Sequence, residues 1–323
     1  MHMIDFTGGR ARMAYTGEEP WHGFGQNLPP GRKVEDWIEA AGLGFEYRLQ
    51  SLRRESPAGF WLRGVPTHKA VVRDDTGDAL GVVGANFKLV QPREVLEFFR
   101  DLTEAGGFEL ETAGALKGGA VVWALARSDT LEPTWVMGQD ELLCRLLLTT
   151  AADGTMNTTA KFVATRTVCW NTLSIGLAES GDEVKVPHRS RFDAADVKRR
   201  LGVGASAWAG FEEQADKLAR FEVAPAGEQR WLVETFGDPA KPLDEQPGLR
   251  TMKKVHALFE GQGQGAGLRS AKGTAWGLVN AATEYVDHHK PERASGNRLH
   301  SAWNGGGAAL KRKAWDNAAR LAA

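Results

Sequence analysis

The spacing of apolar residues changes once along the chain, and this change limits the folds that the chain can adopt. Up to about residue 186, apolar and polar residues mostly alternate, which is the period of a strand. Beyond residue 193, apolar residues return every three or four positions, which is the period of a helix. Strands in one block and helices in the next favour an α+β fold over repeated βαβ units. We therefore expect an antiparallel β-rich body with one prominent helix, followed by a mainly helical C-terminal third.

These periods, together with turn residues, place the individual elements. Strands are expected at 45–52, 59–63, 67–73, 79–84, 108–115, 119–127, 140–151 and 157–168. Helices are expected at 34–42, 92–105, 193–221, 226–236, 249–260, 274–289 and 307–322. For 140–151 the period alone does not decide, and the turn ADGT with a second strand-like run after it favours a strand. The sequence thus predicts a β-rich core domain over residues 1–190 and a helical region over 191–323, with a Pro-rich loop at 238–248.

The composition is that of an ordinary globular protein, with 42% hydrophobic and 25% charged residues in a chain of 323. No apolar run approaches the roughly 20 residues that cross a bilayer, and the N-terminus lacks the apolar segment of a secretory signal. Cys144 and Cys169 lie too far apart for a CxxC metal motif and do not indicate a disulfide framework. We expect a protein of the bacterial cytoplasm that does not bind a membrane.

The net charge of -1 hides an uneven distribution. Residues 250–323 contain twelve Lys and Arg against five Asp and Glu, a net charge of +7, so residues 1–249 carry -8. A basic tail on an acidic body is a candidate surface for phosphate groups, although a solvated helical face would have the same composition.

The glycine-rich segment 261–274, GQGQGAGLRSAKGT, invites comparison with a phosphate-binding P-loop. That motif needs Gly-Lys followed directly by Ser or Thr, after a buried strand. Here Lys272 is followed by Gly273, and helices are expected on both sides. The segment is better interpreted as a flexible connector in which Thr274 caps the next helix, while Arg269 and Lys272 fold onto a polyanion.

Two further groups keep an enzymatic alternative open. Asp287, His288 and His289 form a DHH string that occurs in two-metal phosphoesterases, but no HExxH or D-x-D motif supports it. Histidines at a helix C-terminus also suit the helix dipole without any chemistry. Cys169 lies where we expect a helix to begin, yet no protease-type sequence surrounds it, and buried structural cysteines are common.

Cations and tryptophans favour nucleic acid over these alternatives. Residues 161–200 contain eight Lys and Arg against five Asp and Glu, and Trp170 lies among them. Aromatic rings can stack on bases while cations follow the phosphate backbone. We expect Trp208 and Trp276 to point into the core instead, and leave both interpretations open for Trp170, Trp303 and Trp315.

The stretch KFVATRTVCWNTLSIGL, residues 161–177, joins a strand-like run to a helix-like one. If Asn171 and Thr172 start a helix, their backbone N–H groups can receive a phosphate and Arg166 can add a fixed charge, with Cys169 and Trp170 packed beneath. The alternative is an ordinary helix cap with Arg166 held in a salt bridge to an acidic side chain.

Several blocks in this order resemble a family of phage- and plasmid-borne proteins of unknown function. They are EPWHGFGQNL (19–28), AGLGFEYRL (41–49), GVVGANFKLVQPREVLEFF (81–99), ADGTMNTT (152–159), RTVCWNTLSIGL (166–177), VPHRSRF (186–192) and GTAWGLVNAATEYVDH (273–288). The order of a short helix, β-hairpins and one long helix also resembles, more distantly, phage single-strand-annealing recombinases of the RecT, Redβ and Erf type. That resemblance implies rings or filaments that hold single-stranded DNA in a basic groove without hydrolysing a nucleotide.

The sequence and these resemblances together predict a non-enzymatic, oligomeric protein of mobile elements that binds single-stranded DNA and anneals it, without a cofactor or metal. The residues expected to contact nucleic acid are Lys161, Arg166, Trp170, Asn171, Arg189, Arg191, Lys198, Arg199, Arg200, Arg269, Lys272, Lys311, Arg312 and Lys313. The alternatives are a metal- or thiol-dependent enzyme acting on nucleic acid or nucleotides, and a host-interaction or counter-defence protein whose acidic body binds a basic partner.

Overall fold

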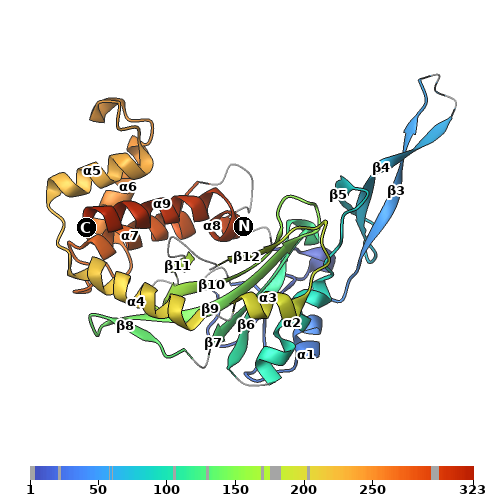
Figure 1. Cartoon of the computed structure of the whole chain (residues 1–323), viewed down its shortest axis with the longest axis horizontal. Helices are drawn as coiled ribbons and strands as arrows, with labels where there is room; N and C mark the ends of the chain where they lie inside the picture. Colours follow the sequence, from blue (N-terminus) through green and yellow to red (C-terminus); the bar gives the residue numbers. More distant parts are fainter. Residues whose placement is uncertain are drawn as a thin grey trace. The chain divides into compact units, whose positions relative to one another are not determined.

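The computed structural model of the chain describes residues 4–20, 23–57, 59, 61–104, 107–128, 131–168, 171–174, 183–201, 204–291 and 298–323. These residues form a mixed α+β structure with antiparallel sheets and helix α2 (Pro92–Glu104) first and a mainly helical C-terminal third, as the sequence predicts (Figure 1). The chain divides into two compact units. The first comprises residues 1–130, 146–161 and 183–202, and the second comprises 131–145, 162–182 and 203–323.

The larger sheet of the first unit combines two short strands that precede α2 in the sequence with strands that follow α2. Its strands include β1 (Met13–Tyr15), β2 (Gln26–Asn27), β6 (Phe108–Leu116), β7 (Val121–Ser128) and β12 (Glu183–Val186). Strand β1 pairs in parallel with β2 and antiparallel with β6, and β6 pairs antiparallel with β7. Strand β12 pairs antiparallel with residues 158–161 of β10 (Thr158–Arg166).

The second sheet of the first unit is a meander of β3 (Tyr47–Glu55), β4 (Leu62–Arg73) and β5 (Ala79–Gly84). The sequence predicts two strands at 59–63 and 67–73, whereas the structure has one strand, β4, with a shift in register opposite Ser51 and Leu52. Pro66 lies in this irregular part, where a residue without an N–H group interrupts no regular ladder. Figure 1 shows β3 and β4 running side by side and extending past β5.

Helices α1 (Val34–Ala40) and α2 pack against each other, and α2 also packs against β6 and β7. The apolar face of α2 is buried, including Phe98 and Phe99, as its sequence period predicts. On the sheet, the ring of Trp123 lies over Gly114, where any side chain would collide with it. Helix α3 (Ala194–Leu201) also belongs to this unit.

The second unit is mainly helical. Its helices are α4 (Gly204–Arg220), α5 (Pro225–Phe236), α6 (Leu249–Ala257), α7 (Ala275–Glu284), α8 (Arg298–Asn304) and α9 (Gly306–Leu321), and π-helical turns extend α6 over Leu258–Gln262 and α7 over Tyr285–His289. Its strands include β8 (Thr134–Val136), which pairs antiparallel with the start of β9 (Asp140–Ala151), and β11 (Asn171–Ser174), which pairs with the end of β10. The sequence missed α8, and the single helix expected at 193–221 corresponds to α3 and α4, between which residues 202 and 203 lie outside the described residues.

Aromatic side chains from three helices form the core of the second unit. Trp208 and Phe211 of α4 stack at 5.6 Å between ring centroids, and Phe211 stacks on Trp315 of α9 at 5.2 Å. Trp276 of α7 meets Trp315 edge to face at 6.1 Å. All four rings are buried, so Trp208 and Trp276 point inward as predicted, and Trp315 joins them rather than the surface.

Thr274 caps α7, because its hydroxyl oxygen accepts a hydrogen bond from the Gly277 N–H, which confirms the role predicted for it. In the described part of the chain, no helix is long and apolar enough to cross a membrane.

Gly277 is expected to tolerate no side chain. A Cβ atom there would collide with the carbonyl oxygen of Ala271 and lie 3.1 Å from Cε2 of Phe259. Because backbone cannot move aside cheaply, Gly277→Ala should lower the free energy of unfolding by about 1–3 kcal/mol in urea denaturation. Gly306→Ala, also in a helix but facing open space, is the control and should be neutral or slightly stabilising. Equal effects of the two changes would contradict this account.

Candidate nucleic-acid interface

The residues expected to contact nucleic acid divide between the two units. Lys161, Arg189, Arg191, Lys198, Arg199 and Arg200 belong to the first unit, and Arg166, Trp170, Asn171, Arg269, Lys272, Lys311, Arg312 and Lys313 belong to the second. Trp170 lies outside the described residues, as does the candidate thiol Cys169. Each unit therefore carries its own set of candidate cations.

Arg166 is buried in the second unit, with 2% of its side chain exposed. Its Nε lies 2.7 and 2.9 Å from the two carboxylate oxygens of Asp140. Its Nη atoms donate to the carbonyl oxygens of Gln264 and Gly265, both at 3.1 Å. The guanidinium therefore neutralises an internal carboxylate and holds the glycine-rich segment, which corrects the expectation of a charge aimed at a bound phosphate.

Asp140 has a full set of partners as well. Besides Arg166, its Oδ2 accepts hydrogen bonds from the Ser270 hydroxyl at 3.0 Å and the Trp276 indole N–H at 2.9 Å. These donors supply the hydrogen bonds that a buried carboxylate requires. The network joins β9, β10, the glycine-rich segment and α7 within the second unit, so it is structural.

The helix expected to begin at Asn171 is wrong. Residues 171–174 form β11, and Asn171 pairs with Arg166 across an antiparallel hairpin. Residues 171–174 pair with β10 instead, so Asn171 offers no helix N-terminus to a phosphate.

Lys311 also forms an internal ion pair. It is buried on α9, and its Nζ donates to Asp287 Oδ1 at 2.8 Å. Asp287 is the first residue of the DHH string, so this carboxylate serves the packing of α9 against the end of α7. His289 lies 3.5 Å from Glu284, and burial, outweighing that carboxylate, lowers the pKa of its imidazole.

The remaining predicted cations differ in how far they are neutralised. Lys161 is buried, Lys198 pairs with Asp101 at 3.0 Å, and Arg199 and Arg200 both approach Asp196. The cations that are exposed and have no acidic partner within 4.0 Å in the described residues are Arg189, Arg191, Arg269, Lys272, Arg312 and Lys313. These six stay candidates for an anionic ligand.

The structure adds a basic surface that the sequence reasoning missed. The described residues of 51–67, here called the arm, form the distal part of the β3–β4 hairpin (Figure 1). The arm contains Arg53, Arg54 and Arg63 against the single acid Glu55. All three arginines are exposed, and among the described residues none has an ion-pair partner.

Two of these arginines lie directly opposite each other. Arg54 of β3 pairs with Arg63 of β4, and Ser56 N–H donates to the Trp61 carbonyl two pairs nearer the tip. Since side chains alternate between the faces of a ribbon, Trp61 shares a face with Arg54 and Arg63. Its indole is 74% exposed, and the next residue, Leu62, is 63% exposed. Two cations and an exposed aromatic ring therefore share one face of the arm.

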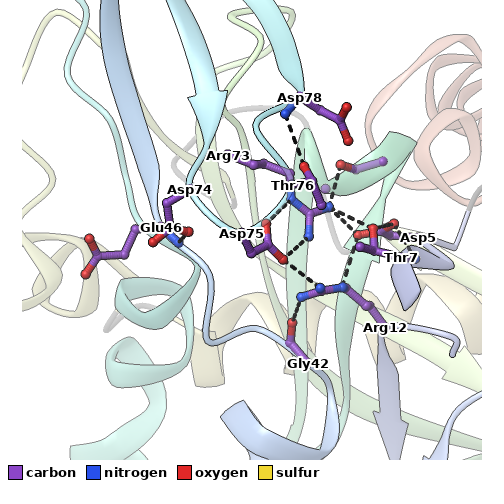
Figure 2. Close-up of polar contacts among 12 residues, drawn as sticks. Asp5, Thr7, Arg12, Gly42, Glu46, Arg73, Asp74, Asp75, Thr76 and Asp78 are labelled. Carbon is purple, nitrogen blue, oxygen red and sulfur yellow. Dashed lines mark hydrogen bonds and ion pairs between the residues drawn. The ribbon is translucent and has the colours of Figure 1, made fainter. Parts of the chain in front are cut away.

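The root of the arm, in contrast, is buried and densely paired. Arg73, the last residue of β4, donates from Nη1 to Asp5 at 2.5 Å and to the Gly118 carbonyl at 2.7 Å. Its Nε and Nη2 contact the two oxygens of Asp75 at 2.9 and 2.8 Å. Figure 2 shows this guanidinium between Asp5 and Asp75, with Arg12 contacting the same two carboxylates.

Arg12 completes this network. Its Nη2 lies 2.6 Å from Asp75, its Nε lies 3.5 Å from Asp5, and its Nη1 donates to the Gly42 carbonyl. The guanidinium groups of Arg12 and Arg73 also lie over the ring of Phe45, at 5.2 and 4.0 Å. The network thus ties the N-terminal segment, the end of α1 and the root of the arm together.

Backbone contacts fix the start of β3 in the same way. Gln91, just before α2, accepts from Tyr47 N–H at 2.8 Å and donates to the Tyr47 carbonyl at 3.1 Å. The Glu46 N–H donates to Asp74 at 2.7 Å. The start of β3 and the end of β4 are therefore both held, which sets the direction of the arm relative to the rest of the first unit.

Among the described residues, one group of three side chains has the donors and the spacing for a metal ion: Glu228, His256 and Glu260 of the second unit. The DHH string is not part of it. Cys144 is no candidate nucleophile, since burial raises the pKa of its thiol to about 12 and keeps it protonated.

Comparison with known proteins gives a family without a function. The family model described as "Domain of unknown function (DUF932)" matches residues 79–303. No curated protein and no solved structure matches the chain.

Replacing Asp140 is expected to destabilise the second unit. Asp140→Ala removes the carboxylate that is paired with the buried Arg166, which should cost about 3–5 kcal/mol of unfolding free energy in urea. Asp316→Ala, at an exposed position on α9, is the control and should change stability by less than about 0.5 kcal/mol. A loss in Asp140→Ala no larger than in this control would contradict the structural role of the network.

The root of the arm predicts a specific dependence on pH. Burial alone would raise the pKa of Asp75, but hydrogen bonds and charges of Arg73 and Arg12 outweigh it and hold the pKa below its ordinary value of 3.8. The folded state therefore binds a proton less readily than the unfolded state, so Asp75 stabilises the fold above that value and less as the pH falls through the folded pKa. Asp75→Asn should be less stable than wild type at pH 7, and the difference should shrink below about pH 4 in urea denaturation. A difference that stays constant with pH would exclude this source of stability.

Proposed function

The chain belongs to the DUF932 family, whose description assigns no activity, and we propose that it binds single-stranded DNA and anneals complementary strands. We place this activity in recombination by phages and plasmids. The observation that carries the proposal is the arm, where Arg54 and Arg63 face each other without an acidic partner among the described residues and Trp61 lies exposed beside them.

The placement of the two arginines favours an anionic ligand. Like charges directly opposite on a ribbon repel each other and weaken the pairing of its strands. No neighbouring carboxylate relieves this repulsion within the described residues, whereas Arg73 at the root of the same strand has two carboxylates around it. A phosphate between Arg54 and Arg63 would accept hydrogen bonds from both guanidinium groups and remove the repulsion.

The exposed indole favours a nucleic acid over a simple anion, and a single strand over a duplex. Trp61 is 74% exposed, so the face of its ring is open to a base. A base that is not paired can stack on Trp61 while its phosphate reaches the arginines on the same face. Stacking accepts any base, so we expect little dependence on sequence.

Annealing adds a requirement for several copies of the chain. One arm presents three arginines and one tryptophan, which is enough to hold only a few nucleotides. Holding a strand in an extended form along its length therefore requires successive copies, so the proposal includes a ring or filament on DNA. The exposed cations Arg189 and Arg191 of the first unit are a second candidate contact along such a strand.

Arm variants test the proposed site through two separable effects. Arg54→Gln with Arg63→Gln should weaken binding of a fluorescent single-stranded oligonucleotide and reduce the slope of log affinity against log salt by about 0.7, because the one phosphate that both guanidinium groups contact is lost. Trp61→Ala should cost about 1–3 kcal/mol of binding energy with little change in that slope. Arg320→Gln, at an exposed residue of the second unit, is the control and should bind as wild type.

The outcomes distinguish the site from the function. If the arm variants bind like wild type while Arg189→Gln with Arg191→Gln binds weakly, DNA binding stands and the arm is not its site. If wild type retains no single-stranded oligonucleotide in low salt without added metal, the function itself is wrong. If wild type captures a basic protein instead, the host-interaction alternative takes its place.

Assembly and annealing are expected to appear together. Light scattering should show a large increase in mass when a long single strand is added, and complementary fluorescent strands should pair faster with protein than without it. Tight binding by a monomer that does not accelerate pairing would leave a DNA-binding protein but exclude an annealing one.

A further inference from the structure

We propose that Glu228, His256 and Glu260 of the second unit bind a divalent metal ion of the zinc type. The three side chains come from two elements that flank the Pro-rich loop 238–248. Glu228 lies in the first turn of α5, while His256 lies at the end of α6 and Glu260 in the π-helical turn that follows it. A metal at this point would join α5 to α6 directly.

The geometry meets the basic requirement of a metal site. One ligand atom from each side chain lies within 4.8 Å of the others. With bonds of roughly 2.0–2.2 Å from zinc to nitrogen or oxygen, small rotations of the side chains bring all three atoms around one ion. His256 and Glu260 are four residues apart, which places them on one side of a helical turn.

The carboxylates of Glu228 and Glu260 have no Lys or Arg partner among the described residues. Glu228 has 11% of its side chain exposed, and its ion-pair partner is the imidazole of His256, at 2.6 Å between Oε1 and Nδ1. Neither Glu228 nor Glu260 has a Lys or Arg partner within 4.0 Å among the described residues, in contrast to Asp140, Asp75 and Asp287. A divalent cation would neutralise both carboxylates, and would take the place of the hydrogen bond between His256 and Glu228.

The donor set also indicates which ions fit. One imidazole nitrogen with two carboxylate oxygens suits zinc and similar first-row ions, whereas calcium and magnesium prefer oxygen donors alone. His256 is 53% exposed and Glu260 is exposed, so an ion can enter from solvent. Three protein ligands leave a fourth position for water.

Zinc binding to the full-length chain tests the proposal. After removal of metals with a chelator, wild type should bind one equivalent of Zn²⁺ in titration calorimetry, and its midpoint of thermal unfolding should rise as Zn²⁺ is added. His256→Ala should lose both effects. Glu260→Gln changes an exposed side chain, so it should fold normally and lose the stoichiometric site as well.

His68→Ala is the matched control, since it removes an exposed histidine from the first unit and should bind Zn²⁺ as wild type does. Wild type that binds no Zn²⁺, or His256→Ala and Glu260→Gln that both keep the full equivalent, would overturn the proposal. Because DNA binding is proposed in the first unit, either result leaves that function untouched.

Discussion

The ion pairs of Arg73 are the interaction on which the first unit depends. A guanidinium without exposed surface is tolerated only when its charge and its donors are satisfied, and here Asp5, Asp75 and the Gly118 carbonyl satisfy them. These partners come from the N-terminal segment, the turn after β4 and the turn between β6 and β7. Folding around one buried charge therefore brings distant parts of the unit to a single point, which is the root of the arm.

Arginines on the same hairpin have opposite roles. Arg73 is buried and shared by two carboxylates, whereas Arg54 and Arg63 on the same hairpin are exposed and have no acidic partner in the described part of the chain. Arg166 and Lys311 resemble Arg73, because each neutralises an internal carboxylate. Burial and pairing, rather than the number of cations, decide which charges are available to a polyanion.

Much of the fold can be predicted from the sequence, because strands such as β5 and helices such as α2 follow from local periods and turn residues. The site cannot, since pairing joins residues that are distant in sequence: Arg166 meets Asp140 and Gln264, 26 and 98 positions away. The strand at Asn171 was missed for the same reason, as its partner β10 decides its conformation. The arm did carry a local signal, three arginines and a tryptophan against one acid, which a charge summed over 249 residues conceals.

Rigidity at the root and exposure at the tip are linked. An isolated two-stranded ribbon is marginally stable in water, and repulsion between Arg54 and Arg63 weakens it further. The ribbon holds its shape because β5 pairs with part of β4. In addition, Arg73, Arg12 and Gln91 fix the first residue of β3 and the last residue of β4 to the rest of the first unit. A ligand that binds at the tip then orders long side chains rather than backbone, which lowers the entropy lost on binding. The buried ion pairs of Arg73 and Arg12 thus hold the ribbon in place despite the repulsion between Arg54 and Arg63.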